Sequence, residues 1–312
     1  MNSNHDRPCF RHPLLILMIL TLVAAATVSL AAQETEQELY SQEIEAWRRD
    51  RVDRLTAEDG WLTLVGLFWL NEGKNPMGSD GSNTVILPAG KAPPYAGAIY
   101  LSGQKLRLEA EPSANIVLQG ESVSKLPLLA DTQGEPTILE TGNISFYVIE
   151  RDKMFAVRVK DPSHPARSEF RGIDYYPVSA DWKVAARFEA HLPPKEIPIP
   201  TEIGTISHQV SSGAVVFEVE GQELRLDVLA EPGAEELFII FADQTTGAET
   251  YGGGRYVYAP APDENGTVLV DFNKAYNPPC VFTSFATCPL PPRQNRLPVR
   301  VEAGEKVYRK AG

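Results

Sequence analysis

Residues 144–160 read ISFYVIERDKMFAVRVK, and this stretch decides the fold class. Residues 144–150 and residues 154–160 each form a run suited to a strand, with a period of two. The charged residues 151–153 between them are typical of a turn. The stretch therefore predicts an antiparallel β-hairpin.

Similar short runs continue on both sides of this hairpin. Residues 182–188 alternate cleanly, with Trp182, Val184, Ala186 and Phe188 on one face. Further strands are predicted at residues 84–87, 99–101, 105–109, 115–118, 203–210, 214–220, 223–229, 237–241, 255–258 and 268–272. Short strands at this spacing are typical of an antiparallel β-sandwich or barrel. We therefore predict a mainly β protein with one large domain over residues 60–312.

Three segments of the predicted β domain depart from the simple pattern of short alternating strands. Residues 61–70 are apolar on both faces, which suits a buried strand broken at Gly66. Residues 71–83 are rich in Gly, Asn, Ser and Asp and are expected to form a loop. Four prolines fall within residues 193–200, where either a seam between two lobes or an edge loop is expected.

A helix is expected over residues 32–59, packing on the β domain. Helical spacing is clearest over residues 34–58, where Tyr40, Ile44, Trp47 and Leu55 recur on one side. Residues 35–38 fit a capping box, and Gly60 is a natural stop. We interpret the charged residues between the apolar ones as a solvated face.

The first 31 residues resemble a secretory signal peptide. Arg7 and Arg11 precede the uncharged apolar run of residues 14–28, and small residues follow it. Cleavage is expected after Ala31, with Ala26 as the rival position. The alternative is an uncleaved anchor, although the run is short for a membrane span. We expect the mature protein to be exported, periplasmic or extracellular, with no membrane span after cleavage.

Composition excludes some classes of partner. The 312 residues are 43% hydrophobic and carry a formal net charge of −12, with a pI near 5.0. The apolar fraction is that of a globular protein. Nucleic-acid binding is not expected, because phosphate contacts need clustered Lys and Arg.

Removal of the leader would leave two cysteines, Cys280 and Cys288. In an oxidising compartment such an isolated pair usually forms a disulfide, which is the interpretation favoured here. A metal site would need His or Asp donors at set spacing, and the histidines His164, His191 and His208 lie elsewhere in the chain. No metal site is expected, and no particular cofactor is indicated.

Polar residues beside glycines and prolines are concentrated in residues 241–297. The candidate catalytic carboxylates are Asp243, Glu249 and Asp271. The candidate ligand-binding residues are Tyr251, Arg255, Asn273, Tyr276, Asn277 and Arg296. Two interpretations stay open: these groups line a pocket, or they form a structural clamp of buried Arg–carboxylate pairs.

No known catalytic motif distinguishes the pocket interpretation from the structural one. Residues 252–254 are three glycines, but no Lys-Ser/Thr ending or helix follows, as a phosphate loop would need. Neither a Gly-x-Ser-x-Gly elbow nor a His-Glu-x-x-His pair occurs.

Several blocks resemble an uncharacterised family, domain of unknown function 1684. Its opening is matched by Gly60-Trp61-Leu62-x-Leu64-x-Gly66-Leu67-x-Trp69-Leu70-x-x-Gly73-x-Asn75-x-x-Gly78-Ser79. Its closing half is matched by Thr250-Tyr251-x-x-Gly254-Arg255, Asp271-Phe272-Asn273-x-Ala275-Tyr276-Asn277-Pro278-x-Cys280 and Cys288-Pro289-Leu290-Pro291-Pro292. The resemblance implies one contiguous domain and assigns no activity, cofactor or catalytic residue.

Three hypotheses for function follow. The first is an exported module that binds a small-molecule or envelope-derived ligand through aromatic side chains and Arg or amide donors. The second is a glycosidase-type hydrolase with paired carboxylates, whose separation would decide the mechanism. The third is an envelope structural or interaction protein without a catalytic site.

Overall fold

The computed structural model describes residues 13–309 and divides the chain into two compact units, Met1–Ala46 and Trp47–Gly312. Helix α1 (Pro13–Thr56) includes most of the helix expected over residues 32–59, but it begins far upstream of residue 32 and ends at Thr56. Residues 35–38, which fit a capping box in the sequence, lie inside α1, because helical backbone already precedes them. Arg7 and Arg11 of the expected signal peptide lie outside the described residues. Within residues 13–309, no helix combines the length and apolar character that crossing a membrane requires.

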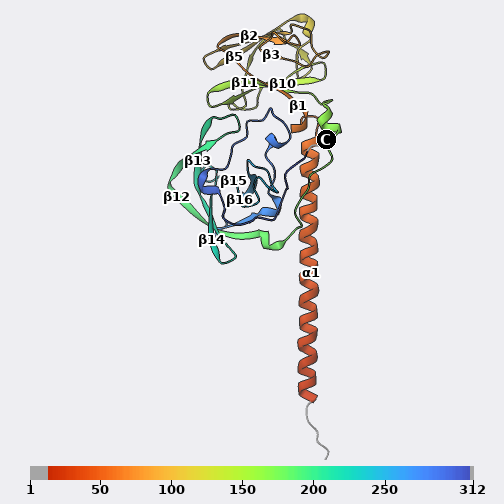
Figure 1. The fold of residues 1–312 in the computed structure, drawn as a ribbon, viewed down its shortest axis with the longest axis vertical. Helices are drawn as coiled ribbons and strands as arrows, with labels where there is room; N and C mark the ends of the chain where they lie inside the picture. Colours follow the sequence, from red (N-terminus) through yellow and green to blue (C-terminus); the bar gives the residue numbers. More distant parts are fainter. Residues whose placement is uncertain (1–12, 310–312) are drawn as a thin grey trace, which may run out of the picture. The chain divides into compact units, whose positions relative to one another are not determined.

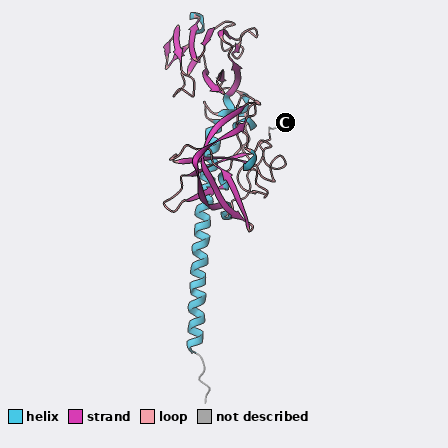
Figure 2. Ribbon diagram, turned by 90° about the vertical axis from the view of Figure 1, so that its left-hand side faces the viewer, coloured by secondary structure: helices cyan, strands magenta, loops and turns pink. Residues whose placement is uncertain are grey.

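The second unit is mostly antiparallel β, as predicted, and contains two sets of sheets (Figures 1 and 2). The first set is built from β1 (Leu64–Trp69), β2 (Gly73–Gly78), β3 (Val85–Ile86), β4 (Gly97–Ser102), β5 (Lys105–Ala110), β6 (Val117–Leu118), β7 (Glu121–Ser122), β8 (Lys125–Leu128), β9 (Leu139–Thr141), β10 (Ile144–Arg151) and β11 (Met154–Lys160). These strands form a six-stranded sheet, β1-β11-β10-β9-β6-β7, and a five-stranded sheet, β3-β2-β4-β5-β8.

The hairpin of residues 144–160 forms as predicted. Strands β10 and β11 pair antiparallel, and Val148 lies opposite Val157. Both valines are buried in the core that the two sheets share. Asp152 and Lys153 make the turn with positive φ angles of 51° and 64°, the conformation that a tight hairpin requires.

The expected loop over residues 71–83 is only partly correct, because β2 lies within it. Strand β2 pairs with β4 antiparallel and with the short β3 in parallel. The buried Met77 provides its core contact. Polar, glycine-rich composition concealed the strand, since few of its residues have the side chains that strands favour.

The second set of sheets contains β12 (Lys183–Pro200), β13 (Ile206–Val219), β14 (Gln222–Asp227), β15 (Glu236–Phe241), β16 (Arg255–Pro260) and β17 (Thr267–Asp271). They form a four-stranded sheet, β14-β13-β12-β17, and a two-stranded sheet, β15-β16. The short helices are α2 (Pro165–Ser168), η1 (Trp61–Thr63), η2 (Pro112–Ala114), η3 (Ala180–Trp182), η4 (Phe272–Lys274), η5 (Pro279–Val281) and η6 (Arg293–Asn295).

The proline-rich residues 193–200 lie within β12 rather than in an edge loop. The pairing of β12 with β13 shifts between Ala190 and Lys195, and two of the prolines fall in this irregularity. A bulge is a place where a strand tolerates proline. The first core draws its buried residues from Met77 to Val159 and the second from Val184 to Ala303. The sequence therefore passes from one core to the other before β12 begins.

A third, smaller cluster of buried side chains supports the site described next. Ile197, Ile199, Leu229 and Ile240 pack there with Tyr256, and Phe238 and Tyr276 pack against them. Apolar residues of β12 and β15 thus hold the aromatic rings of β15 and β16 from behind.

Candidate functional site

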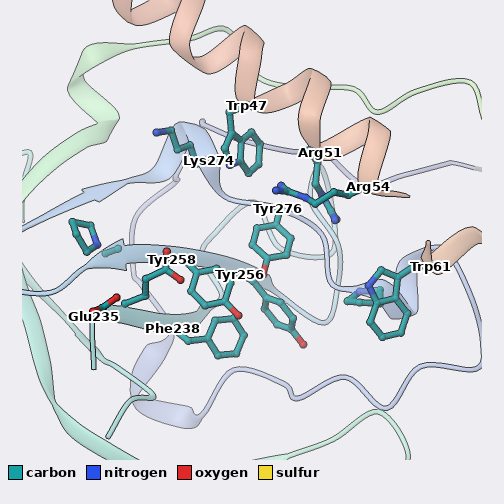
Figure 3. Close-up of a pocket in the computed structure, with 14 residues that line it drawn as sticks. Trp47, Arg51, Arg54, Trp61, Glu235, Phe238, Tyr256, Tyr258, Lys274 and Tyr276 are labelled. Atoms are coloured by element: carbon teal, nitrogen blue, oxygen red, sulfur yellow. The ribbon is translucent and has the colours of Figure 1, made fainter. Parts of the chain in front are cut away.

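A cleft of about 790 Å³ lies between the last turns of α1 and strands β15 and β16 (Figure 3). Its lining residues are Trp47, Arg51, Arg54, Trp61, Glu235, Glu236, Phe238, Tyr256, Tyr258, Ala259, Pro260, Lys274, Tyr276 and Pro279. A cleft of this volume is within the range that small-molecule sites occupy. We call it the aromatic cleft, because six of its side chains are Trp, Tyr or Phe.

Four rings form one continuous wall of the cleft. Phe238 of β15 lies opposite Tyr258 of β16 in the strand register, and the two rings stack with centroids 4.8 Å apart. Tyr258 in turn stacks on Tyr276 at 6.3 Å, with an interplanar angle of 13°. Tyr256 meets the rings of Phe238 and Tyr276 edge to face at 5.0 Å and 5.7 Å. Such offset and edge contacts are the favoured aromatic geometries.

Backbone hydrogen bonds fix this wall in place. Tyr256 and Tyr276 exchange both N–H to C=O bonds, at 2.9 Å and 2.8 Å. The hydroxyl of Tyr256 donates to the carbonyl of Pro289 at 2.7 Å. Burial raises the pKa of Tyr256, Tyr258 and Tyr276 above the ordinary tyrosine value. The folded state therefore favours the neutral phenol at all three positions.

Arg51 links α1 to this wall. Its guanidinium lies over the Tyr276 ring at 4.7 Å, a cation–π contact. Its Nε donates to Oε1 of Glu305 at 3.0 Å, and its Nη2 donates to the Asn277 carbonyl at 2.9 Å. The other oxygen of Glu305 accepts the Asn277 N–H at 2.7 Å. Complete burial raises the pKa of Glu305, and the contact with Arg51 opposes that effect.

The structure places the predicted Asp243 and Arg255 in a buried ion pair. Arg255 Nη2 donates to Asp243 Oδ2 at 2.7 Å and also to the Val301 carbonyl at 2.8 Å. A second donor of Arg255 bonds the Ala303 carbonyl. Asp243 accepts the Thr245 N–H at 2.7 Å and the Val301 N–H at 3.1 Å. Together they clamp the C-terminal segment to β15 and β16, which is the structural interpretation of these residues.

The other two predicted carboxylates also make structural contacts. Glu249 accepts hydrogen bonds from Arg300 and from the Tyr176 hydroxyl, the latter at 2.9 Å. Its contact with Arg300 lowers the pKa of Glu249. Asp271 caps η4 by accepting the Asn273 N–H at 3.1 Å. None of the three predicted carboxylates lines the aromatic cleft, so their catalytic role stays a prediction.

The predicted ligand-binding residues are scattered. Tyr276 lines the cleft, whereas Asn273 and Asn277 are buried and bond backbone carbonyls of Ser179 and Lys306. The Tyr251 hydroxyl donates to Glu202 at 2.8 Å. Arg296 is exposed, away from the cleft lining.

The expected disulfide is not formed in the structure, where Cys280 and Cys288 are free thiols. They are nonetheless neighbours, because the Cys280 N–H donates to the Cys288 sulfur at 3.1 Å. The Cys288 thiol lowers the pKa of Cys280, and the same contact raises that of Cys288. The pair thus bonds through a backbone N–H and a thiol rather than through a sulfur–sulfur bond. Within residues 13–309, no three His, Cys, Asp or Glu side chains are placed to hold a metal ion.

The sequence interpretation missed most of the cleft. Trp47, Arg51 and Arg54 recur at intervals of four and three, so they lie on one side of α1. That spacing was a usable signal for a mixed aromatic and basic face. Phe238 and Tyr258 gave no comparable signal, because each reads as an ordinary strand residue.

Comparisons with known proteins give a family and no activity. Residues 168–306 match the family described as "Protein of unknown function (DUF1684)". The match covers the closing motifs quoted above and leaves out the opening one at residues 60–79. No curated protein matches the sequence.

Two solved structures are similar over part of the chain. One is the solution NMR structure of an uncharacterized protein of Haloarcula marismortui, 30% identical, covering 45% of this chain and 78% of that one, with a TM-score of 0.38. The other comes from a study of phosphothreonine-dependent FHA domain interactions. It is 20% identical and covers 31% of this chain and 96% of that one, with a TM-score of 0.22.

Proposed function

The chain belongs to the DUF1684 family of proteins of unknown function, and from its own geometry we propose that it binds a small ligand in the aromatic cleft. The observation that carries this proposal is the wall of four rings, Phe238, Tyr256, Tyr258 and Tyr276, beside a cleft of about 790 Å³. Binding sites for small molecules are typically concave, mostly apolar and lined by aromatic side chains with a few polar groups.

The exposed part of the wall indicates what kind of ligand fits. Tyr258 is 48% exposed although its ring is stacked between Phe238 and Tyr276. A partly exposed ring that neighbouring rings already hold in position offers apolar contact area to a ligand at little entropic cost. The ligand is therefore a molecule with a ring or a compact apolar body that packs on Tyr258.

The hydrolase alternative finds less support. Asp243 and Asp271 are buried and hold backbone groups or Arg255. A general acid or base has to reach the proton it transfers, directly or through one water. Neither carboxylate belongs to the cleft lining, so neither meets that condition for a ligand bound there.

Export is part of the proposal. The leader-like residues 1–31 are followed by an acidic chain, so we place the mature protein outside the cytoplasm. N-terminal sequencing of the protein recovered from a cell envelope or medium fraction checks this point. A chain that begins at Ala32 or Thr27 supports export, and an intact Met1 in the cytoplasmic fraction contradicts it.

The binding proposal is tested with ring compounds of different charge. Phenol, benzoate, benzyltrimethylammonium and glucose are titrated into the protein at up to millimolar concentration and followed by calorimetry. We expect saturable binding of at least one, weakened about tenfold or more by Tyr258→Ala and restored by Tyr258→Phe. Tyr95→Ala is the matched control, because Tyr95 is 39% exposed and lies outside the cleft lining.

Two outcomes contradict the proposal. One is that no compound of the panel binds; the other is that binding survives Tyr258→Ala unchanged. The first result favours the third hypothesis, an envelope structural or interaction protein without a catalytic site, and the second places the ligand outside the aromatic cleft.

A further inference from the structure

Three arginines are buried in the part of the chain that the structure describes, and two of them have a carboxylate partner. Arg51 donates to Glu305 at 3.0 Å. Arg255 donates to Asp243 at 2.7 Å. The third is Arg158 of β11, which is only 4% exposed. Among residues 13–309, no carboxylate lies within 4 Å of its guanidinium, so Arg158 is a buried cation without a counter-charge.

The hydrogen bonds of Arg158 leave one edge of its guanidinium unused. Nη1 donates to the Tyr147 hydroxyl at 3.3 Å, and this is its one hydrogen bond to a described residue. Nε is buried and has no hydrogen-bond partner. Nη2 has no partner either within residues 13–309. Nε and Nη2 form one edge of the planar group, and such paired donors match two oxygens of a carboxylate or a phosphate.

Two aromatic rings hold this guanidinium in place. Its central carbon lies 5.1 Å from the centroid of the Trp61 ring and 5.9 Å from that of the Tyr147 ring. Cation–π contacts of this kind offset part of the cost of burying a charge. They are weaker than hydrogen bonds to a carboxylate, and they leave the Nε and Nη2 donors without an acceptor. The rings therefore position the charge of Arg158 without neutralising it.

A second cation without a carboxylate partner lies near Arg158. Lys160 is two residues further along β11, so both side chains project from the same face of the strand. The Lys160 ammonium lies 5.5 Å from the Tyr147 centroid and donates to the backbone carbonyl of Asp59 at 2.6 Å. Within the described residues, the ion pairs do not include Lys160. Tyr147 and Lys160 are both half-buried, so this positively charged cluster reaches the protein surface.

We propose that Arg158 binds a small oxyanion, a carboxylate or phosphate group that accepts from both Nε and Nη2, and that Lys160 adds to the attraction. A buried ion that lacks its partner is strongly destabilising, and the oxyanion supplies both the counter-charge and the missing acceptors. The formal net charge of −12 opposes the approach of anions, so the contacts at Arg158 have to supply the affinity. This site is independent of the proposed function, because the cleft lining includes Trp61 but not Arg158.

The test uses inorganic phosphate and acetate as separate probes. Each is titrated into the protein by calorimetry in Tris chloride buffer, with the ionic strength held constant by sodium chloride. We expect saturable binding of at least one probe, which should also raise the melting temperature more than chloride does. Arg158→Gln should weaken this binding about tenfold or more, and Lys160→Gln should weaken it by a smaller factor. The stronger of the two probes shows which oxyanion the guanidinium edge prefers.

Arg107→Gln is the matched control. Arg107 also lies over an aromatic ring, 4.6 Å from the Tyr100 centroid, but it has a carboxylate partner in Glu109. Its removal should leave the affinity for the probe unchanged. Arg158→Lys keeps the charge and loses the planar pair of donors, so its affinity should lie between those of the parent and Arg158→Gln. Circular dichroism verifies that each variant is folded, and Arg158→Lys against the parent carries the test if Arg158→Gln does not fold.

Three results overturn the oxyanion site. One is that neither phosphate nor acetate binds saturably. Another is that binding persists unchanged in the folded Arg158 variants, because the anion then binds elsewhere. The third is that Arg107→Gln weakens binding as much as Arg158→Gln, because net charge alone then explains the effect. The aromatic cleft stands or falls separately, by the titrations of Tyr258→Ala.

Discussion

Nη2 of Arg255 lies 2.7 Å from Oδ2 of Asp243, and both side chains are almost completely inaccessible to solvent, at 1% and 0% exposure. The pair also hydrogen-bonds to the backbone of Val301 and Ala303. A buried charge without its partner is strongly destabilising. Removal of either charge should therefore destabilise the folded protein.

Asp243→Asn should lower the free energy of unfolding by about 3–5 kcal/mol, because it leaves the Arg255 guanidinium buried without a counter-charge. Urea unfolding followed by tryptophan fluorescence measures the loss. Glu249→Gln is the comparison, since it removes one partner of the exposed pair with Arg300 and should cost clearly less. Equal losses in the two variants would show that burial of the first pair has no energetic consequence.

Gly254→Ala should be destabilising by about 1–3 kcal/mol, while Gly252→Ala should change little. Gly254 has a φ of +81°, and a Cβ there would lie 2.6 Å from the Phe241 carbonyl oxygen. At Gly252 a Cβ would meet only the Gly247 Cα, at 3.9 Å. Thermal and urea unfolding of both variants measures the loss of stability. Similar losses of stability at the two positions would contradict this prediction.

Tyr176 should make the protein lose stability at alkaline pH. Burial and the hydrogen bond to Glu249 raise the pKa of Tyr176 to about 12 from the ordinary value of 10.0. The folded state thus favours the neutral phenol. This contribution is fully present below pH 10 and is lost as the pH rises through about 12.

The measurement is the free energy of unfolding at several pH values from 8 to 12. Tyr176→Phe cannot ionise at this position, so its stability should fall less steeply above pH 10 than that of the parent. Tyr95→Phe controls for the loss of one tyrosine elsewhere. Parallel curves for the parent and Tyr176→Phe would remove Tyr176 from the alkaline transition.

Cys280 should react with N-ethylmaleimide faster than Cys288. Cys280 is partly exposed and its pKa is lowered by the neighbouring thiol, whereas Cys288 is buried and its pKa is raised. The thiolate is the reactive form, so both differences act in the same direction. Mass spectrometry of Cys9→Ser protein, sampled over time, gives the order of labelling. Labelling of both cysteines only after reduction would instead support the disulfide predicted from the sequence.

Much of the fold was predictable because its signals are local. The hairpin of β10 and β11 was recognised from its alternating runs and turn, and the mainly β class is confirmed. The two errors in the predicted strands also have local causes. Strand β2 lacks typical strand residues, and the prolines of β12 suggested an interruption where the strand tolerates them at a bulge.

The candidate site was less predictable, because side-chain chemistry does not reveal whether a group is buried or faces a cavity. Asp243 and Arg255 had the residue types of a site, and the fold uses them as an internal ion pair. Tyr258 had no distinctive signal, and it became the exposed ring of the cleft only because Phe238 and Tyr276 support it.

The amino-acid order by itself determined the β class, the helix that ends before Gly60 and the family, because these depend on periodicity and on motifs of neighbouring residues. Tertiary structure alone decided which polar groups became scaffold and which rings line a cleft. The lining joins Trp47 and Arg51 to residues near 236, 258 and 276. Contacts across such separations arise only when distant segments pack together, and no local pattern encodes them.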